Sequence, residues 1–105
     1  MTPNEFDRLA DSMLERIATA IDESGADCDY ESKGSGVLEI EFADASRIVV
    51  NRHSAAQEIW VAAKSGGYHF RFDGSTWVDT RDGRELLEAL SGLMSEQSKK
   101  AIVLR

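Results

Sequence analysis

The spacing of apolar residues changes twice along the chain, and this change limits the fold more than any other feature. Between Phe6 and Ile21 apolar residues recur at steps of three and four, the spacing of one face of an α-helix. From Asp27 the step becomes two, as in half-buried β-strands. Helical spacing returns between Leu86 and Met94. The sequence therefore predicts a helix, a series of strands and a second helix.

Both expected helices begin with the pattern of a capping box. Thr2-Pro3-Asn4-Glu5 places a hydroxyl at the N-cap, proline at the first helical position and a glutamate three residues after the cap. Asp82-Gly83-Arg84-Glu85 has the same spacing and predicts that the second helix begins after Asp82. Gly25 suits the left-handed position that ends the first helix.

The segments between the helices alternate polar and apolar residues. Strands are expected at residues 27–33, 37–42, 47–51, 57–64 and 68–72 and around Trp77. Turn sequences such as Ser65-Gly66-Gly67 separate them, and connections this short join antiparallel strands. We therefore expect an α+β fold, a two-layer α/β sandwich. Its antiparallel sheet has five to six strands, with the N- and C-terminal helices packed on one face, in a single domain over residues 1–105.

Negative charge is concentrated in the first third of the chain. Residues 5–31 contain nine acids and two bases, whereas residues 32–105 contain ten of each, so the net charge of −7 arises in the first stretch. Nucleic acid and anionic membrane surfaces are disfavoured as partners, because both require clustered basic residues. Cations or a basic protein surface are the partners that this charge favours.

The carboxylates form two expected rows. One side of the first helix carries Asp7, Asp11, Glu15 and Asp22. One side of the first strand carries Asp27, Asp29 and Glu31. Together with Glu23 we call these residues the acidic ridge. Each like-charge pair at i, i+4 costs an isolated helix about 0.2–0.5 kcal/mol. Two interpretations remain open, a solvated helix face and a face that binds a cation or a partner.

Catalytic motifs are absent from the sequence. It contains no glycine-rich phosphate loop, no Cys/His pair of metal-ligand spacing and no nucleophile elbow, so we expect no enzyme. A ferroxidase would need clustered ligands, and none are evident. The single cysteine, Cys28, cannot form an internal disulfide. With no signal peptide or membrane-length apolar run, a cytoplasmic protein is expected.

Trp60 is the second candidate feature. Strand alternation places it opposite Ile59 and Val61 and therefore on the face away from the core. A tryptophan there, near Arg52 and His69, is a natural anchor for protein contact. The alternative is that neighbouring side chains cover it, and the sequence leaves both open.

Three segments resemble a known family. Asn51-Arg52, Gln57-x-Ile59-Trp60 and Lys64-Ser65-Gly66-Gly67-Tyr68-His69-Phe70 are similar to the strand signature of frataxins, and the acidic start fits their bacterial branch. The resemblance covers essentially the whole chain. It implies the same α/β sandwich and an iron-binding protein of iron–sulfur cluster assembly that modulates the cysteine desulfurase and supplies or buffers iron. It also implies contact with the scaffold protein of that machinery.

The resemblance also implies functional residues. Fe²⁺ or Fe³⁺, and other divalent cations, are expected to bind weakly at the surface carboxylates Asp7, Asp11, Glu15, Asp22 and Glu23. Partner contact is expected at Asp22, Glu23, Asp27, Asp29, Glu31, Trp60 and Arg52. Ala18 interrupts the helix row where relatives carry an acid. We expect a monomer that forms oligomers with iron. The competing hypothesis is a protein-interaction module whose carboxylates bind no metal in its function.

Overall fold

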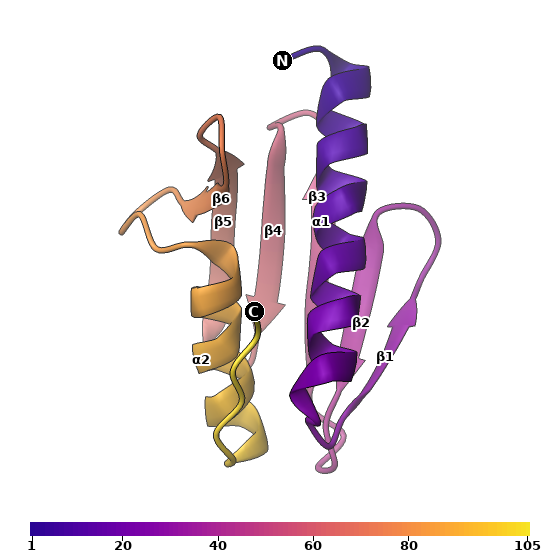
Figure 1. Cartoon of the computed structure of the whole chain (residues 1–105), viewed down its shortest axis with the longest axis vertical. Coiled ribbons are helices and arrows are strands. Elements are labelled where there is room, and N and C mark those ends of the chain that lie inside the picture. Colours follow the sequence, from indigo (N-terminus) through magenta and orange to yellow (C-terminus); the bar gives the residue numbers. More distant parts are fainter.

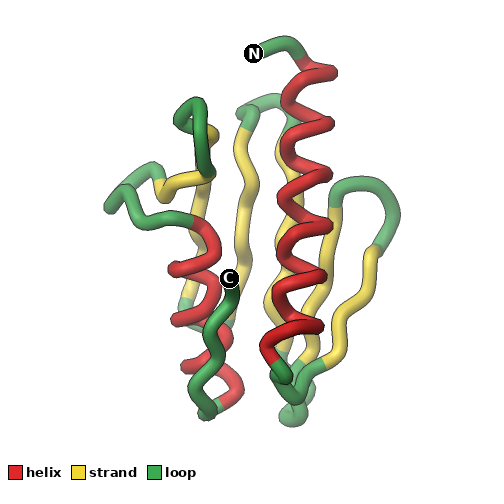
Figure 2. The backbone as a smooth tube through the Cα atoms, viewed as in Figure 1, coloured by secondary structure: helices red, strands yellow, loops and turns green.

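The computed structural model describes all residues from Met1 to Arg105 as two helices and six strands. The elements are, in chain order, α1 (Pro3–Ser24), β1 (Asp29–Ser32), β2 (Val37–Glu41), β3 (Arg47–His53), β4 (Glu58–Ala63), β5 (Gly66–Phe72), β6 (Trp77–Asp79) and α2 (Leu86–Ser98). The strands form one antiparallel sheet in the order β1-β2-β3-β4-β5-β6. Both helices lie on the same face of this sheet (Figure 1, Figure 2). The expected two-layer sandwich is confirmed.

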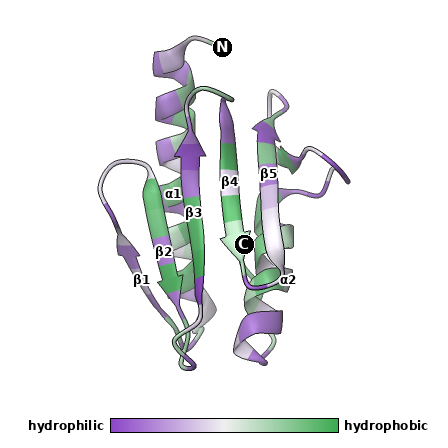
Figure 3. Ribbon diagram, turned by 180° about the vertical axis from the view of Figure 1, so that it is seen from behind, coloured by the Kyte–Doolittle hydropathy of each residue, from purple (hydrophilic) through white to green (hydrophobic).

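The core fills the space between the helices and the sheet. It consists of 23 buried apolar residues, among which Phe6, Ile17 and Phe70 are fully buried. Apolar residues of the strands point toward the helices, as the alternation predicted, and Figure 3 shows polar residues interleaved with them along the strands. The opposite face of the sheet carries no helix (Figure 3). Neither helix is long and apolar enough to cross a membrane.

The predicted start and end of α1 are confirmed. Thr2 and Glu5 form the reciprocal capping box, and Gly25 ends the helix with a φ of 71°. The predicted start of α2 was wrong. Its N-cap is Glu85, whose carboxylate accepts hydrogen bonds from two amides of the first turn. Glu85 is held extended by a bridge to Val78 of β6, so the helix cannot begin earlier.

Several strand boundaries also differ from prediction, and β3 continues to His53, two residues beyond its predicted end at residue 51. The first strand begins at Asp29 and not at Asp27, because the preceding residues complete the turn out of α1. The β4–β5 turn contains Lys64 and Ser65 alone, since Ala63 pairs with Gly66. The two glycines that were expected in this turn therefore belong to β5.

The last five residues, 101–105, return along the helix layer between α1 and α2, and we call them the C-terminal tail (Figure 1). Ile102 and Leu104 are buried and belong to the core. Their amides donate to the hydroxyls of Ser95 and Ser91, at 2.9 and 2.8 Å. The tail thus fills the space between the helices.

Candidate functional site

Asp7 and Asp11, which we call the upper part of the acidic ridge, are partly neutralised by one arginine. Nη1 of Arg52, on β3, lies 2.6 Å from both carboxylate oxygens of Asp11, and its Nε lies 3.7 Å from Oδ1 of Asp7. The Arg52 side chain is only 19% exposed. Arg52 therefore joins the sheet to α1. Its guanidinium faces the helix, so the structure gives it a structural contact in addition to the partner contact expected from the sequence.

Gly36 makes room for this arginine. A Cβ on Gly36 would lie 2.6 Å from Cγ and Nε of Arg52, and Gly36 also has a φ of 75°. Gly34 has nearly the same φ, 76°, with open space around it. It is therefore a matched control that carries the backbone strain without the steric conflict.

We expect Gly36→Ala to lower the free energy of unfolding by about 2 kcal/mol or more and Gly34→Ala by about 1 kcal/mol. The difference arises because a methyl at Gly36 displaces Arg52 from Asp11. Urea denaturation of both variants measures it. Equal destabilisation would show that the Arg52 packing contributes nothing.

The lower part of the ridge, the carboxylates from Glu15 to Glu31, keeps most of its charge. Glu15, Glu23, Asp27 and Asp29 are exposed and have no cationic group within 4.0 Å. Two ridge residues have partners there. Asp22 accepts a hydrogen bond from the Tyr30 hydroxyl at 2.7 Å, which raises the pKa of Tyr30. Glu31 lies 3.4 Å from Nζ of Lys33. The unneutralised charge therefore surrounds the C-terminal end of α1 and the edge strand β1.

The structure does not gather the ridge into a compact metal site. No group of three or more His, Cys, Asp or Glu side chains is close enough to hold one ion. A groove of about 300 Å³ runs between α1 and the β1–β2 turn, with Asp11 and Glu15 on its helix side and Ala18 beside them. Carboxylates spaced in this way suit hydrated cations that keep most of their water ligands. The metal assignments at individual ridge residues remain predictions.

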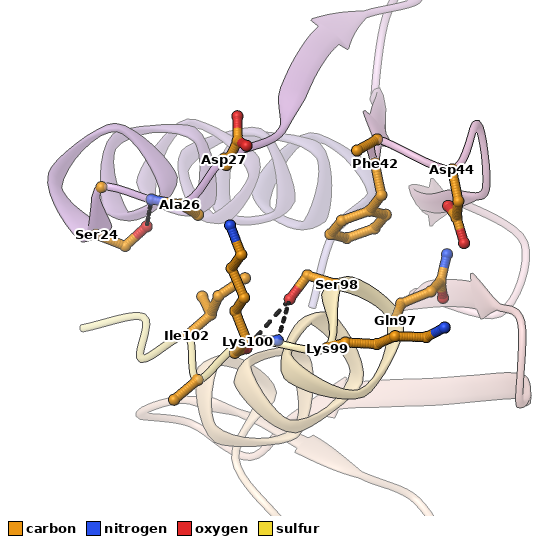
Figure 4. Close-up of a pocket in the computed structure, with 13 residues that line it drawn as sticks. Ser24, Ala26, Asp27, Phe42, Asp44, Gln97, Ser98, Lys99, Lys100 and Ile102 are labelled. Atoms are coloured by element: carbon orange, nitrogen blue, oxygen red, sulfur yellow. Dashed lines mark hydrogen bonds between the residues drawn. The ribbon is translucent and has the colours of Figure 1, made fainter.

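Pocket geometry elsewhere supplies no better candidate. The cavity in Figure 4, about 270 Å³, lies between the end of α1, the β2–β3 turn and the end of α2. Lys99 and Lys100 line it together with Asp27, Asp44 and Phe42. The buried Gln97 on its wall has both ends of its amide bonded within the protein. The cavity is thus part of the junction that locks α2 to the sheet.

The second candidate, Trp60, lies on the sheet face that carries no helix. Its indole is sandwiched between the imidazoles of His53 and His69, with ring centroids 3.8 and 4.5 Å away and interplanar angles of 11° and 9°. We call this the His–Trp–His stack. Trp60 is half-buried, and both flat faces of the indole are covered. Neighbouring side chains therefore cover it, as one of the two sequence interpretations held, and only its edge is left for a partner.

The sequence alone did not identify His53 as part of the site, although the pairing of the strands places it beside Trp60. Trp60 lies directly opposite His69 on β5 and opposite Asn51 on β3, which makes His53 its diagonal neighbour. Aromatic rings at such diagonal positions are within reach of one another. The observed register, rather than composition, was needed to find the stack.

Glu58 anchors the stack from β4. It is 7% exposed, and its carboxylate accepts hydrogen bonds from Nε1 of Trp60 and Nη2 of Arg71, each at 2.8 Å. Nδ1 of His69 lies 3.6 Å away. Burial by itself raises the pKa of Glu58, but the bonds from Trp60 and Arg71 outweigh burial and hold the pKa below its ordinary value of 4.5.

A lowered pKa makes Glu58 a source of pH-dependent stability. The folded state stabilises the charged form of Glu58 more than the unfolded state does. The resulting stability is present above the ordinary pKa, which the unfolded chain keeps, and is lost as pH falls through the folded pKa. We expect Glu58→Gln to cost about 1–2 kcal/mol at pH 7. The cost should shrink below pH 4, and chemical denaturation at pH 7 and pH 3.5 measures this. A cost that is independent of pH would contradict the assignment.

The model of the frataxin-like domain matches residues 1–100 of the chain. This chain belongs to the frataxin family.

Sequence relatives place this frataxin in the bacterial CyaY branch. It is 58% identical to a protein of Dechloromonas aromatica over the full length of both chains. It is 48% identical to a protein of Cupriavidus metallidurans, over 100% of this chain and 97% of the relative. Both relatives bear the name iron–sulfur cluster assembly protein CyaY.

Solved structures confirm the fold of this frataxin. The frataxin of Psychromonas ingrahamii matches with a TM-score of 0.90 at 34% identity, covering 98% of this chain and 97% of its own. A trimeric frataxin of Saccharomyces cerevisiae, complexed with ferrous iron, matches with a TM-score of 0.71 at 27% identity. That match covers 87% of this chain and 86% of the yeast chain.

Proposed function

We propose that this frataxin is an iron-binding protein of iron–sulfur cluster assembly that regulates the cysteine desulfurase through its acidic ridge. The observation that carries the proposal is the unneutralised lower ridge around the end of α1 and β1. The names of the two bacterial relatives and the ferrous complex of the yeast frataxin support the same role.

The lower ridge acts by electrostatics. Exposed carboxylates without cationic partners raise the local concentration of Fe²⁺ and steer the protein onto a basic surface of its partner. Both effects weaken with salt, because the Debye length falls from about 10 Å at 0.1 M to about 3 Å at 1 M. Since no three ligands converge, each ion is held by one or two carboxylates and exchanges readily. Weak binding of this kind suits delivery or buffering of iron rather than storage.

The sheet face gives the second contact. The edge of Trp60 and the rings of His53 and His69 form a flat, rigid patch away from the ridge, which suits the scaffold protein of the same machinery. The protein acts in this proposal by binding alone, with no catalytic step of its own. Self-association is driven by iron, in keeping with the trimeric ferrous complex of the yeast frataxin.

An anaerobic titration with Fe²⁺, followed through backbone amide resonances, tests the metal role. We expect shifts in residues 7–31, strongest near Glu15 and Glu23. The double variant Glu15→Gln/Glu23→Gln should lose most of this response, whereas Glu88→Gln/Glu96→Gln on α2 should keep it, because those exposed acids lie outside the ridge. A titration without response in residues 7–31 would refute the metal role.

The competing proposal is an interaction module without metal. The observation in its favour is that the exposed carboxylates form no preformed cluster of metal ligands. Desulfurase activity measured with and without a chelator separates the two proposals. Full regulation in the presence of chelator supports the module, and loss of regulation that Fe²⁺ restores supports the iron-dependent regulator.

A further inference from the structure

The β3–β4 turn, residues 54–57, is held by an imidazole. The amide of Ala56 donates a hydrogen bond to Nδ1 of His53 at 3.3 Å. A backbone N–H can only donate, so Nδ1 must be unprotonated and the ring must be neutral, with its proton on Nε2. The turn needs this support because Gln57 has a φ of 53°, a conformation that residues other than glycine rarely adopt.

The stack fixes the position of the His53 ring. Its face lies on Trp60 at 3.8 Å, and a protonated imidazole is attracted to the face of an indole. Protonation therefore leaves the ring in place. A doubly protonated ring, however, has N–H groups on both nitrogens and accepts no hydrogen bond from Ala56. A proton taken up by His53 thus acts on the turn and not on the stack.

Four charged or titratable groups surround this position. Glu58 lies opposite His53 in the register of β3 and β4, and its carboxylate is 3.6 Å from Nδ1 of His69. Arg71 is bound to the same carboxylate. His69 has no backbone hydrogen bond on its ring, so its protonation breaks none. Arg52, the neighbour of His53 on β3, is engaged with α1 on the other side of the sheet.

The turn connects the outer face to the start of the chain. The hydroxyl of Ser54 donates to Oδ1 of Asp7 at 3.4 Å, and Nε2 of Gln57 donates to the carbonyl of Met1 at 2.9 Å. We propose that His53 is a proton-operated latch, in which protonation of Nδ1 releases the turn 54–57 and loosens its contacts with the N-terminal end of α1.

Nuclear magnetic resonance of the ¹⁵N-labelled protein tests the latch between pH 8 and pH 5, which spans the usual range of histidine titration. At pH 8 the ring nitrogens of His53 should show the Nε2–H tautomer. As His53 takes up its proton, the Ala56 amide should shift with the same midpoint. Its protection factor against hydrogen exchange should fall about tenfold, the effect of losing one hydrogen bond.

Two variants separate the latch from other titrations. In His53→Asn the side-chain oxygen still accepts a hydrogen bond but does not titrate, so the Ala56 amide should become insensitive to pH. In His69→Gln the stack loses its other imidazole, and the Ala56 transition should persist. An Ala56 resonance that stays constant while His53 titrates would overturn the proposal. So would a transition that remains in His53→Asn or one that disappears in His69→Gln.

Discussion

Reversing two charges of the lower ridge, Glu23→Lys and Asp29→Lys, should weaken the proposed binding to the cysteine desulfurase about thirtyfold. Each exposed charge pair contributes up to about 1 kcal/mol, and reversal adds repulsion, so the two together cost roughly 2 kcal/mol. Neither side chain has a cationic partner within the protein, so the fold should tolerate both changes. Isothermal titration or surface plasmon resonance measures the affinity.

The matched control is Glu88→Lys with Glu96→Lys. These two residues are exposed acids on α2, and their reversal changes the net charge by the same amount. We expect less than a threefold effect on affinity, from the general change in charge alone. Equal losses for both double variants would show that net charge, and not the ridge, directs binding. Raising salt from 0.05 to 0.5 M should reduce the difference between the two variants, because exposed charges are screened.

Replacing Ile102 and Leu104 by alanine should lower the free energy of unfolding by about 4 kcal/mol. Both side chains are nearly buried, 7% and 5% exposed, and belong to the core between the two helices. A buried leucine or isoleucine truncated to alanine costs roughly 2–5 kcal/mol, and the lower limit applies to the end of a chain. Chemical denaturation followed by circular dichroism measures the loss.

Val103→Ala is the control for the C-terminal tail. Val103 lies between the two core residues and is 58% exposed, so its truncation should cost less than about 0.5 kcal/mol. A small effect of Ile102→Ala/Leu104→Ala, similar to that of Val103→Ala, would mean that the tail does not contribute to the core. Since the tail lies in the helix layer, the double variant should leave the His–Trp–His stack and the charges of the acidic ridge unchanged as long as the protein remains folded.

Most of the fold could be predicted from the sequence because local signals and burial agree. The capping box at Thr2, the left-handed Gly25 and the alternation of the strands each point to the observed elements. Only the predicted start of α2 was wrong, because Glu85 pairs with Val78, a contact between residues that no local pattern displays. The β4–β5 turn was misplaced for the same reason, since the register between Ala63 and Gly66 decides it.

The charged residues of the candidate site could be predicted from the sequence, but their contacts within the protein could not. Counting charges located the ridge, but it did not show that Arg52 pairs with Asp7 and Asp11, which come from a helix some forty residues earlier in the chain. The partners of Trp60 depend likewise on which residues of β3 and β5 lie beside it. Long-range pairing therefore determines which of the ridge carboxylates remain free.

The position of β1 at the open edge of the sheet has a consequence for assembly. An edge strand offers unpaired backbone groups to any second copy of the chain, and charged side chains are a common protection against such pairing. Asp29 and Glu31 line this edge, so two copies that approach through β1 repel each other. A cation bound at the lower ridge would remove that repulsion. The same carboxylates would then set both the affinity for iron and the concentration at which copies of the chain associate.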